Sequence, residues 1–525
     1  MLLVVLLAIA LSWQVARIDR PFRGNLEGLQ TGVPLEGARS FARYGFAASR
    51  GAAVVNAGRI DRASNRVLYA NHPTGVLVVV AGALQVFGDN EWASRLVPAL
   101  CALGCMILLA ILAWPALGPT AALVAAGAFA FAPISLVFAD QVEYIGSPLL
   151  LCALATIACW LRWRATAAPA WLAATVGCFI LAALCDWPAF YLAPLLALHA
   201  LIAQRLNRRA WIEATMIGLL STALFVLLVL WANWAAGASI LSRVAARSSA
   251  FDDADQAITL ARWLQWGIGH QYGLMHTWPL LILGLTGTAL ALLPRTRQTL
   301  GASAASPSVA PLLLVAGWGA LHLAIGWQGN YQHEFWNLIV TPALALGAGA
   351  AVSWILNATL RARAMAAAPL VIVVLIAAFA LTSRSIAATY SDEEYGWSAD
   401  YPRPYAMREL GRVIRATASP TEGVLTAYQE GPQAGWAHPA LLWYADRQLR
   451  VAIDTPEKLN AALGAGPYPL FFEQEQPDGP APTWFVLHNS ERSQYPQLSR
   501  ELDTRFGPAV QHGEFVAYRL DRDQR

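Results

Sequence analysis

The sequence predicts a polytopic α-helical membrane protein with about eleven transmembrane helices, followed by a soluble α/β domain. Hydrophobic residues make up 57% of the 525 residues and charged residues only 13%, a balance typical of integral membrane proteins. Apolar runs recur as far as residue 383, whereas the chain beyond mixes charges of both signs with turn residues. We therefore expect a membrane domain at 1–383 and an extracytoplasmic domain at 384–525.

Eleven apolar segments are long enough, or nearly so, to cross a bilayer, which takes about 17–25 helical residues. They lie near residues 2–16, 96–114, 119–138, 147–163, 170–186, 188–204, 211–235, 276–294, 309–327, 336–357 and 367–383. A twelfth apolar stretch, residues 74–88, is shorter, and its length favours a re-entrant or interfacial helix.

Arginine placement sets the orientation. If residues 74–88 do not cross, four arginine-containing loops face the cytoplasm, as the positive-inside rule requires. They are "RWR", "QRLNRR", "PRTR" and "RAR". Arg17, Arg20 and Arg23 depart from this pattern, because they follow the first span on the predicted outer side. We expect a plasma (inner) membrane protein whose first outer loop, residues 17–95, and C-terminal domain are extracytoplasmic.

The segment from residue 384 contains four strand-like pieces, "GVLTAY", "LRVAID", "TWFVLHN" and "EFVAYRL", separated by helical pieces such as "RPYAMRELGRVIRA". This alternation is typical of an α/β domain. It carries no Gly-rich phosphate loop and no catalytic signature, so we interpret it as a lid or docking module.

Composition excludes several classes of function. A net charge of +3 without a basic, aromatic-rich cluster argues against nucleic-acid binding. All six cysteines fall inside apolar segments, so neither a disulfide framework nor a zinc motif is indicated. The one lysine, Lys458, lies in the C-terminal segment, so a cation serving the membrane part must be arginine, histidine or a metal ion.

Carboxylates and histidines gather on the predicted outer face. Ionisable groups near a bilayer are costly, and a cluster at one face is a candidate functional site. The candidates are Glu27, Glu36, His72, Asp140, Glu143, Asp186, His270, His276, His333 and Glu334.

The two glutamates of the first outer loop also have a structural interpretation. Glu27 and Glu36 could be solvated loop residues. Alternatively, Glu36 could pair with Arg39 or Arg43 on an amphipathic helix, since these residues lie at helical spacing.

The other candidates have similar alternatives. Asp140 and Glu143 could mark the outer end of a span, and Asp186 could cap the helix that follows it. His72, before a proline, could be a turn residue, and His333 could be an interfacial anchor.

Several outer-face motifs occur in a recognisable order: "ARSFARYGF", "YANHPTG", "FGDNEWASRLVPAL", "FADQVEYIGSPLLL", "DWPAFYLAP" and "HEFWNLIVTPALAL". In order and spacing they resemble the GT-C superfamily of polyprenyl-phosphate-sugar-dependent glycosyltransferases, in the branch of the protein O-mannosyltransferases and the lipid A aminoarabinose transferases. The resemblance covers about residues 1–360 and is strongest over 38–165. It implies interfacial helices in the first outer loop.

The chain departs from this family at two motifs. It reads Asn25-Leu26-Glu27-Gly28 where relatives usually carry an acidic pair. His72 stands where some relatives have lysine, and Thr74 replaces a second proline.

The resemblance implies sugar transfer from a polyprenyl-phosphate-linked donor to a hydroxyl of a protein, lipid or polysaccharide acceptor. The implied general base is Glu27, with Glu36 and Asp140 in reserve. Donor or acceptor contacts would come from His72, Glu143, Asp186, His270, His276 and His333. A divalent metal ion stays open as a cofactor.

Two other classes compete with this interpretation. A flippase or transporter predicts functional charges near mid-bilayer and often a twofold repeat, whereas here the ionisable groups gather at one face and no repeat is evident. A non-catalytic scaffold would leave the order of the outer-face motifs unexplained.

Overall fold

The computed structural model describes residues 1–22, 26–55, 58, 66–237, 240, 259–293, 309–359, 368–391, 404–420, 422–427, 438–450, 453–464, 468–469, 475–476, 482–513 and 515–520. The chain divides into two compact units. Unit 1 comprises residues 1–18, 70–76 and 95–391, and unit 2 comprises residues 19–69, 77–94 and 392–525. The first outer loop therefore groups largely with the C-terminal segment, a grouping that the predicted division at 383/384 did not anticipate.

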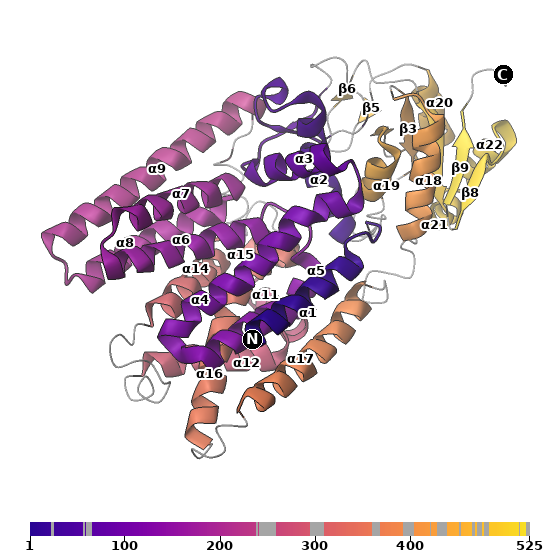
Figure 1. The fold of residues 1–525 in the computed structure, drawn as a ribbon. Helices are drawn as coiled ribbons and strands as arrows, with labels where there is room; N and C mark the ends of the chain where they lie inside the picture. Colours follow the sequence, from indigo (N-terminus) through magenta and orange to yellow (C-terminus); the bar gives the residue numbers. More distant parts are fainter. Residues whose placement is uncertain are drawn as a thin grey trace. The chain divides into compact units, whose positions relative to one another are not determined.

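Unit 1 is built from helices, many of which run side by side in Figure 1. They are α1 (Leu2–Arg17), α4 (Glu91–Phe131), α5 (Pro133–Phe138), α6 (Ser147–Thr166), α7 (Pro169–Cys185), η3 (Trp187–Tyr191), α8 (Leu192–Ala203), α9 (Arg208–Ala236), α11 (Leu260–Trp266), η4 (Gly267–Met275), α12 (Trp278–Leu292), α14 (Ala310–Ile325), α15 (Trp327–Gln332), η5 (Glu334–Val340), α16 (Thr341–Thr359) and α17 (Ala368–Ser391). Helix α3 (Gly75–Phe87) begins in unit 1 and continues into unit 2, and the first residues of α4 also belong to unit 2.

Several of these helices have the length and composition of membrane spans. Within the described residues five are long and apolar enough to cross, and a bent pair, α11–η4 with α12, makes up to six. Shorter apolar helices cover other predicted spans. The number of crossings, about eleven, stays a prediction. At about 1.5 Å per residue the 13 residues of α3 extend only about 20 Å, which is too short for the hydrocarbon core.

Local sequence explains two features of the bundle. Helix α4 is kinked at Gly118, whose φ of 88° favours glycine, and this kink separates the two spans predicted at 96–114 and 119–138. Helices α12 and α16 pack closely through glycines: a Cβ on Gly287 would lie 1.8 Å from the Gly347 carbonyl oxygen. Small residues at such a contact let two membrane helices approach.

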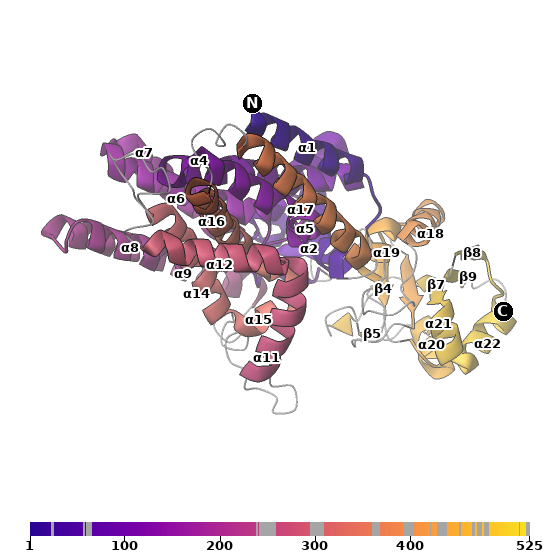
Figure 2. The same ribbon diagram turned by 90° about the horizontal axis from the view of Figure 1, so that it is seen from below.

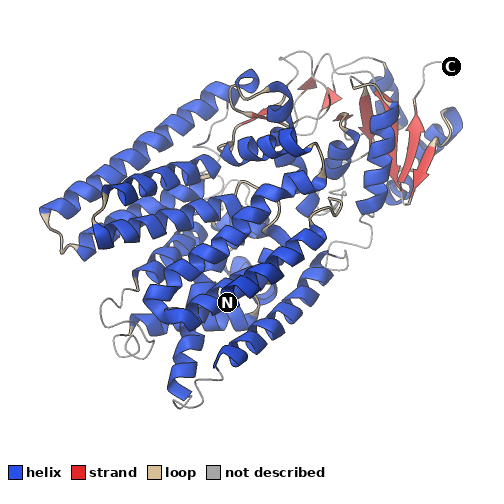
Figure 3. Ribbon diagram, in the orientation of Figure 1, coloured by secondary structure: helices blue, strands red, loops and turns tan. Residues whose placement is uncertain are grey.

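Unit 2 contains helices and the strands of the chain (Figure 3). The elements are α2 (Leu26–Tyr44), η1 (Ala47–Ser49), β1 (Ala53–Val54), β2 (Leu68–Tyr69), α18 (Pro404–Thr417), β3 (Gly423–Thr426), α19 (His438–Ala445), β4 (Gln448–Arg450), α20 (Pro456–Leu463), β5 (Tyr468–Pro469), β6 (Glu475–Gln476), β7 (Pro482–His488), α21 (Asn489–Gln494), α22 (Pro496–Arg505), β8 (Val510–His512) and β9 (Phe515–Arg519).

One sheet of unit 2 has the strand order β4-β3-β7-β9-β8. Strand β3 pairs in parallel with β4 and β7, whereas β9 pairs antiparallel with β7 and β8. Each of the four predicted strand-like pieces overlaps one of these strands. Apolar side chains from the sheet and from α20 and α22, among them Leu459, Phe485 and Leu498, form a buried core.

Candidate functional site

Three segments of unit 1 that are far apart in the sequence meet at the candidate site. The first is residues 71–75, which lead into α3. The second is the turn between α5 and α6, and the third is the junction between α7 and η3. The Trp187 indole N–H donates to the Asn71 carbonyl oxygen at 2.7 Å, and a Cβ on Gly75 would lie 2.6 Å from the Leu184 carbonyl oxygen. The "NHPTG" and "CDWP" motifs are therefore in direct contact.

His72 and Asp186 form a pair at this junction. His72 Nδ1 lies 2.9 Å from Asp186 Oδ1, and the Asp186 side chain is fully buried. The same oxygen accepts from the Trp187 backbone N–H at 2.7 Å, so Asp186 also caps η3, as the structural alternative predicted. A carboxylate at Nδ1 fixes the orientation of the imidazole ring.

Tyr144 is a site residue that the sequence did not single out. Its ring stacks on the His72 imidazole, with centroids 4.6 Å apart and planes 16° apart. Tyr144 follows Glu143 directly, and its backbone N–H donates to Glu143 Oε2 at 3.0 Å. The sequence signal that could have identified Tyr144 is its position directly after Glu143, a predicted site residue.

Glu143 is buried next to this pair. Burial raises the pKa of Glu143 well above its ordinary value, the Tyr144 N–H opposes this increase, and the nearby Asp186 charge adds to it. The acidic second outer loop thus contributes a carboxyl group whose protonated form is favoured. Such shifted groups are typical of functional sites, although buried structural carboxyls show them as well.

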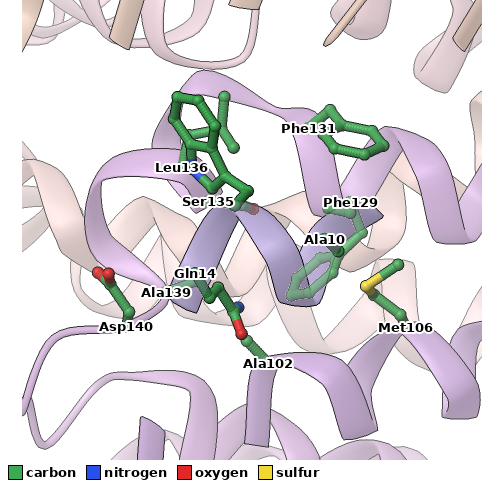
Figure 4. A pocket seen from close by; sticks show the side chains of 12 residues that line it. Ala10, Gln14, Ala102, Met106, Phe129, Phe131, Ser135, Leu136, Ala139 and Asp140 are labelled. Atoms are coloured by element: carbon green, nitrogen blue, oxygen red, sulfur yellow. The ribbon is translucent and has the colours of Figure 1, made fainter. Parts of the chain in front are cut away.

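Asp140 lines a small pocket of unit 1 formed by α1, α5 and residues from both halves of α4. Figure 4 shows Ala10 and Gln14 of α1, Met106 of α4 and Asp140 around this pocket. The pocket is largely apolar, with polar atoms contributed by a few side chains.

The predicted histidines beyond residue 260 belong to a different cluster of unit 1. His276 is fully buried, and its Nε2 lies 3.1 Å from the Thr341 hydroxyl. Tyr272 stacks on His276 and donates to Asn337 at 2.9 Å. His333 packs against Phe335 and Trp336.

Two further residues bear on this cluster. The Gln271 side chain donates to the Glu334 carbonyl oxygen at 2.7 Å, which ties η4 to η5. His270 lies within η4, but its side chain is outside the described residues. Neutral polar side chains in apolar segments were the sequence signal for this network.

Glu27 and Glu36 both lie on α2, in unit 2. The side chain of Glu27 is outside the described residues. Glu36 is 2% exposed and contacts the Arg39 guanidinium at 2.5 Å, which is the pairing that the structural alternative predicted. Arg39 also contacts Asp89 at 3.0 Å and donates to the Trp443 carbonyl oxygen at 3.0 Å.

Asp446 completes this buried cluster from the C-terminal segment. It accepts from Arg43 at 2.8 Å and lies 3.7 Å from Arg39. Burial opposes ionisation of Asp446, but Arg39, Arg43 and Arg415 together lower its pKa. Burial raises the pKa of Glu36 to about 8, although the neighbouring Arg39 lowers it.

Glu36 should make unit 2 sensitive to alkaline pH. Its pKa is raised on folding, so its contribution to stability is complete below its ordinary pKa of 4.5 and is lost as the pH rises through about 8. The unfolding temperature of the wild type, followed by tryptophan fluorescence, should fall across this interval relative to Glu36→Gln. Parallel pH profiles for the two proteins would contradict this assignment.

Comparisons with known proteins can now be set beside this geometry. The family model of dolichyl-phosphate-mannose-protein mannosyltransferases matches residues 71–234. A comparison with curated protein sequences gives no significant match.

Among solved structures, ArnT from Cupriavidus metallidurans bound to undecaprenyl phosphate matches with a TM-score of 0.60 and 17% identity, over 99% of this chain and 98% of that chain. The Archaeoglobus fulgidus oligosaccharyltransferase in its apo form matches with a TM-score of 0.54 and 11% identity, over 93% and 70% of the two chains. The chain has the GT-C fold. This confirms the resemblance inferred from the order of the outer-face motifs.

Within the GT-C fold, the segment matched by the family model contains His72, Asp140, Glu143 and Asp186. The candidate pair and its acidic neighbours thus lie in the part of the chain that two independent comparisons share. Among the residues described, no group of three or more histidine, cysteine or acidic side chains is arranged to hold a metal ion.

Proposed function

We propose that the protein is a membrane glycosyltransferase that moves a sugar from a polyprenyl-phosphate-sugar donor to an acceptor hydroxyl at the extracytoplasmic face of the inner membrane. The observation that carries this proposal is the fold shared, over nearly the full length of both chains, with an ArnT structure bound to undecaprenyl phosphate. The archaeal oligosaccharyltransferase AglB, whose structure contains a dolichol-phosphate, supports it with a TM-score of 0.52 and 11% identity, over 93% and 69% of the two chains.

The reaction sets two tasks for the protein. A carboxylate takes the proton of the acceptor hydroxyl while the oxygen attacks the anomeric carbon of the sugar. The bond between that carbon and the phosphate oxygen breaks, and the polyprenyl phosphate leaves with the electron pair. A positioned base commonly contributes about 100- to 10,000-fold, and a fixed cation stabilises the departing phosphate.

Our first choice for the base is Glu27, followed by Glu36 and then Asp140. The acceptor, whether protein, lipid or polysaccharide, would approach from the extracytoplasmic side, where we also place residues 384–525. His270, His276 and His333 remain proposed donor contacts. His276 would have to give up its contact with Thr341 to take this role.

His72 supplies the phosphate contact in this proposal. Asp186 holds Nδ1 and Tyr144 covers one ring face, so the imidazole is fixed in place to donate to the donor phosphate. Lysine serves this position in some members of the resembled family, and here the imidazole N–H of His72 would take the place of the lysine as a donor to the phosphate. Glu143 is placed to contact the sugar or the acceptor.

Asp186→Asn tests the pairing with little change in shape. Asparagine is also a good cap, so the Trp187 N–H keeps an acceptor and η3 should form. Loss of the charged contact should raise the KM for the donor about 10- to 100-fold, the usual worth of a charge-assisted hydrogen bond. Initial rates measured against donor concentration check this. An unchanged KM with a lowered kcat would remove His72 from phosphate binding.

The proposed function is tested by incubating purified protein with a panel of radiolabelled polyprenyl-phosphate sugars, hexoses and pentoses included, and with candidate acceptors. We expect one label to move to an acceptor and to be lost with Glu27→Gln. A matched assay in sealed vesicles follows the labelled lipid across the bilayer. Lipid movement without any transfer would favour the flippase and overturn the proposal.

A further inference from the structure

Two arginines of unit 1, one at the end of α1 and one in the last third of α17, contact the same indole ring. The Arg17 guanidinium carbon lies 5.0 Å from the Trp13 ring centroid, and that of Arg384 lies 5.3 Å from the same centroid. Helices α1 and α17 run side by side in both Figure 1 and Figure 2. The ring thus brings together two positive charges from opposite ends of the membrane part of the sequence.

Neither guanidinium has an acidic partner in the described part of the chain. Arg17 donates to the Leu136 carbonyl oxygen, and Arg384 is exposed with Trp13 as its contact. Since each guanidinium carbon lies within 5.3 Å of the same ring centroid, an anion beside Trp13 would be attracted by both positive charges. Both residues also lie on the predicted outer side, where the positive-inside rule disfavours arginine, so the proposed transfer reaction leaves their placement unexplained.

Exposed apolar side chains of α1 and α17 surround these two arginines. We call this surface the α1/α17 seam. Helix α1 exposes Val4, Ile9 and Val15, and α17 exposes Leu370 and Val374. Exposed apolar side chains on long apolar helices face hydrocarbon in a membrane, and tryptophan with arginine is typical of its headgroup boundary.

The small pocket lined by Asp140 is also lined by Trp13, so an apolar recess lies beside the two arginines. Trp13 and Gln14 line the apolar pocket of Figure 4, and within the described residues neither Trp13 Nε1 nor Gln14 Oε1 has a hydrogen-bond partner. Met106 and Phe129 form part of the apolar wall of this pocket, and Asp140 also lines it. The lining of the pocket is largely apolar, which suits hydrocarbon, so we place the phosphate at the arginines and not inside the pocket.

We propose that Arg17 and Arg384 bind the phosphate of an anionic phospholipid, with an acyl chain along the α1/α17 seam and its upper part beside the pocket next to Trp13. Each guanidinium group provides a planar fork of N–H donors suited to a phosphate diester. This lipid would be a bound constituent of the protein and not the sugar donor, so the site goes beyond the transfer reaction.

The test compares wild type, Arg17→Gln/Arg384→Gln, and the control Arg162→Gln/Arg208→Gln, which removes two exposed arginines of α6 and α9. Each protein is studied by native mass spectrometry with phosphatidylglycerol, phosphatidylcholine, polyprenyl phosphate and inorganic phosphate. We expect phosphatidylglycerol to bind the double variant about thirtyfold more weakly than wild type, since two charge-assisted contacts to its phosphate are lost. The control should match wild type.

Several results would overturn the site. Equal phosphatidylglycerol binding by wild type and double variant removes the arginines from it, and equal binding of phosphatidylcholine removes charge selectivity. Preference for polyprenyl phosphate would assign the seam to the donor, and saturation by inorganic phosphate alone would assign it to a soluble anion. Loss of the Arg17 contact with Leu136 could prevent folding of the double variant. In that case the binding of phosphatidylglycerol to Arg384→Gln alone tests the site, because no hydrogen bond in the described residues depends on Arg384.

Discussion

Replacing Arg39 by methionine is expected to destabilise unit 2 by about 3–5 kcal/mol, the usual cost of removing one partner from a buried ion pair. Arg39 is 3% exposed, lies between Glu36, Asp89 and Asp446, and its guanidinium carbon sits 3.5 Å from the Trp443 ring centroid. Methionine fills similar space but leaves the Trp443 carbonyl oxygen without its donor. The unfolding temperature in detergent, followed by tryptophan fluorescence, measures the loss.

Arg412→Met is the matched control for this substitution. Arg412 also lies near acidic groups, with Glu409 at 3.4 Å, but its side chain is half exposed. Exposed ion pairs contribute little, so the control should unfold within experimental error of wild type. An Arg39 variant as stable as the control would mean that the cluster is not a fixed link between α2 and α19.

The membrane part of the fold could be predicted from the sequence because hydrocarbon imposes a simple requirement of length and apolarity. The kink at Gly118 and the short α3 follow from residues visible in the sequence. The bent junction between η4 and α12 could not be predicted from the sequence, since it depends on buried contacts such as that between His276 and Thr341. The grouping of the first outer loop with the C-terminal segment also depends on contacts between distant residues, such as Arg39 with Trp443.

Some contacts of the candidate site could also be predicted from local sequence, whereas contacts between distant residues could not. The sequence could predict that Glu36 pairs with Arg39 and that Asp186 caps a helix, because helical spacing and a local turn fix these two interactions. The His72–Asp186 contact spans 114 residues, and periodicity carries no information about such pairs. Asp446 was missed for that reason: it lies in a segment without a catalytic signature, and only folding brings its carboxylate beside Arg43.

In the proposed reaction, the choice between the two glutamates of α2 would decide where proton transfer occurs. Glu36 is buried beneath Arg39, and its pKa of about 8 means that at pH 7 its protonated form is favoured. Glutamine resembles that protonated form in shape and hydrogen bonding. Glu36→Gln should therefore keep most of the transfer activity, and it serves as the internal control for any substitution on this helix.

Glu27→Gln should lower the transfer rate by at least about 100-fold, the lower end of what a positioned general base contributes. Because Glu27 lies near the start of α2 and the change keeps side-chain size, membrane insertion and the unfolding temperature should match wild type. The rate is measured with saturating donor, so that a loss in kcat is separated from a change in donor affinity. Retained turnover in Glu27→Gln, together with loss in Glu36→Gln, would move the base to Glu36, since opening of its contact with Arg39 would then be part of each catalytic cycle. Loss confined to Asp140→Asn would move it instead to the second outer loop.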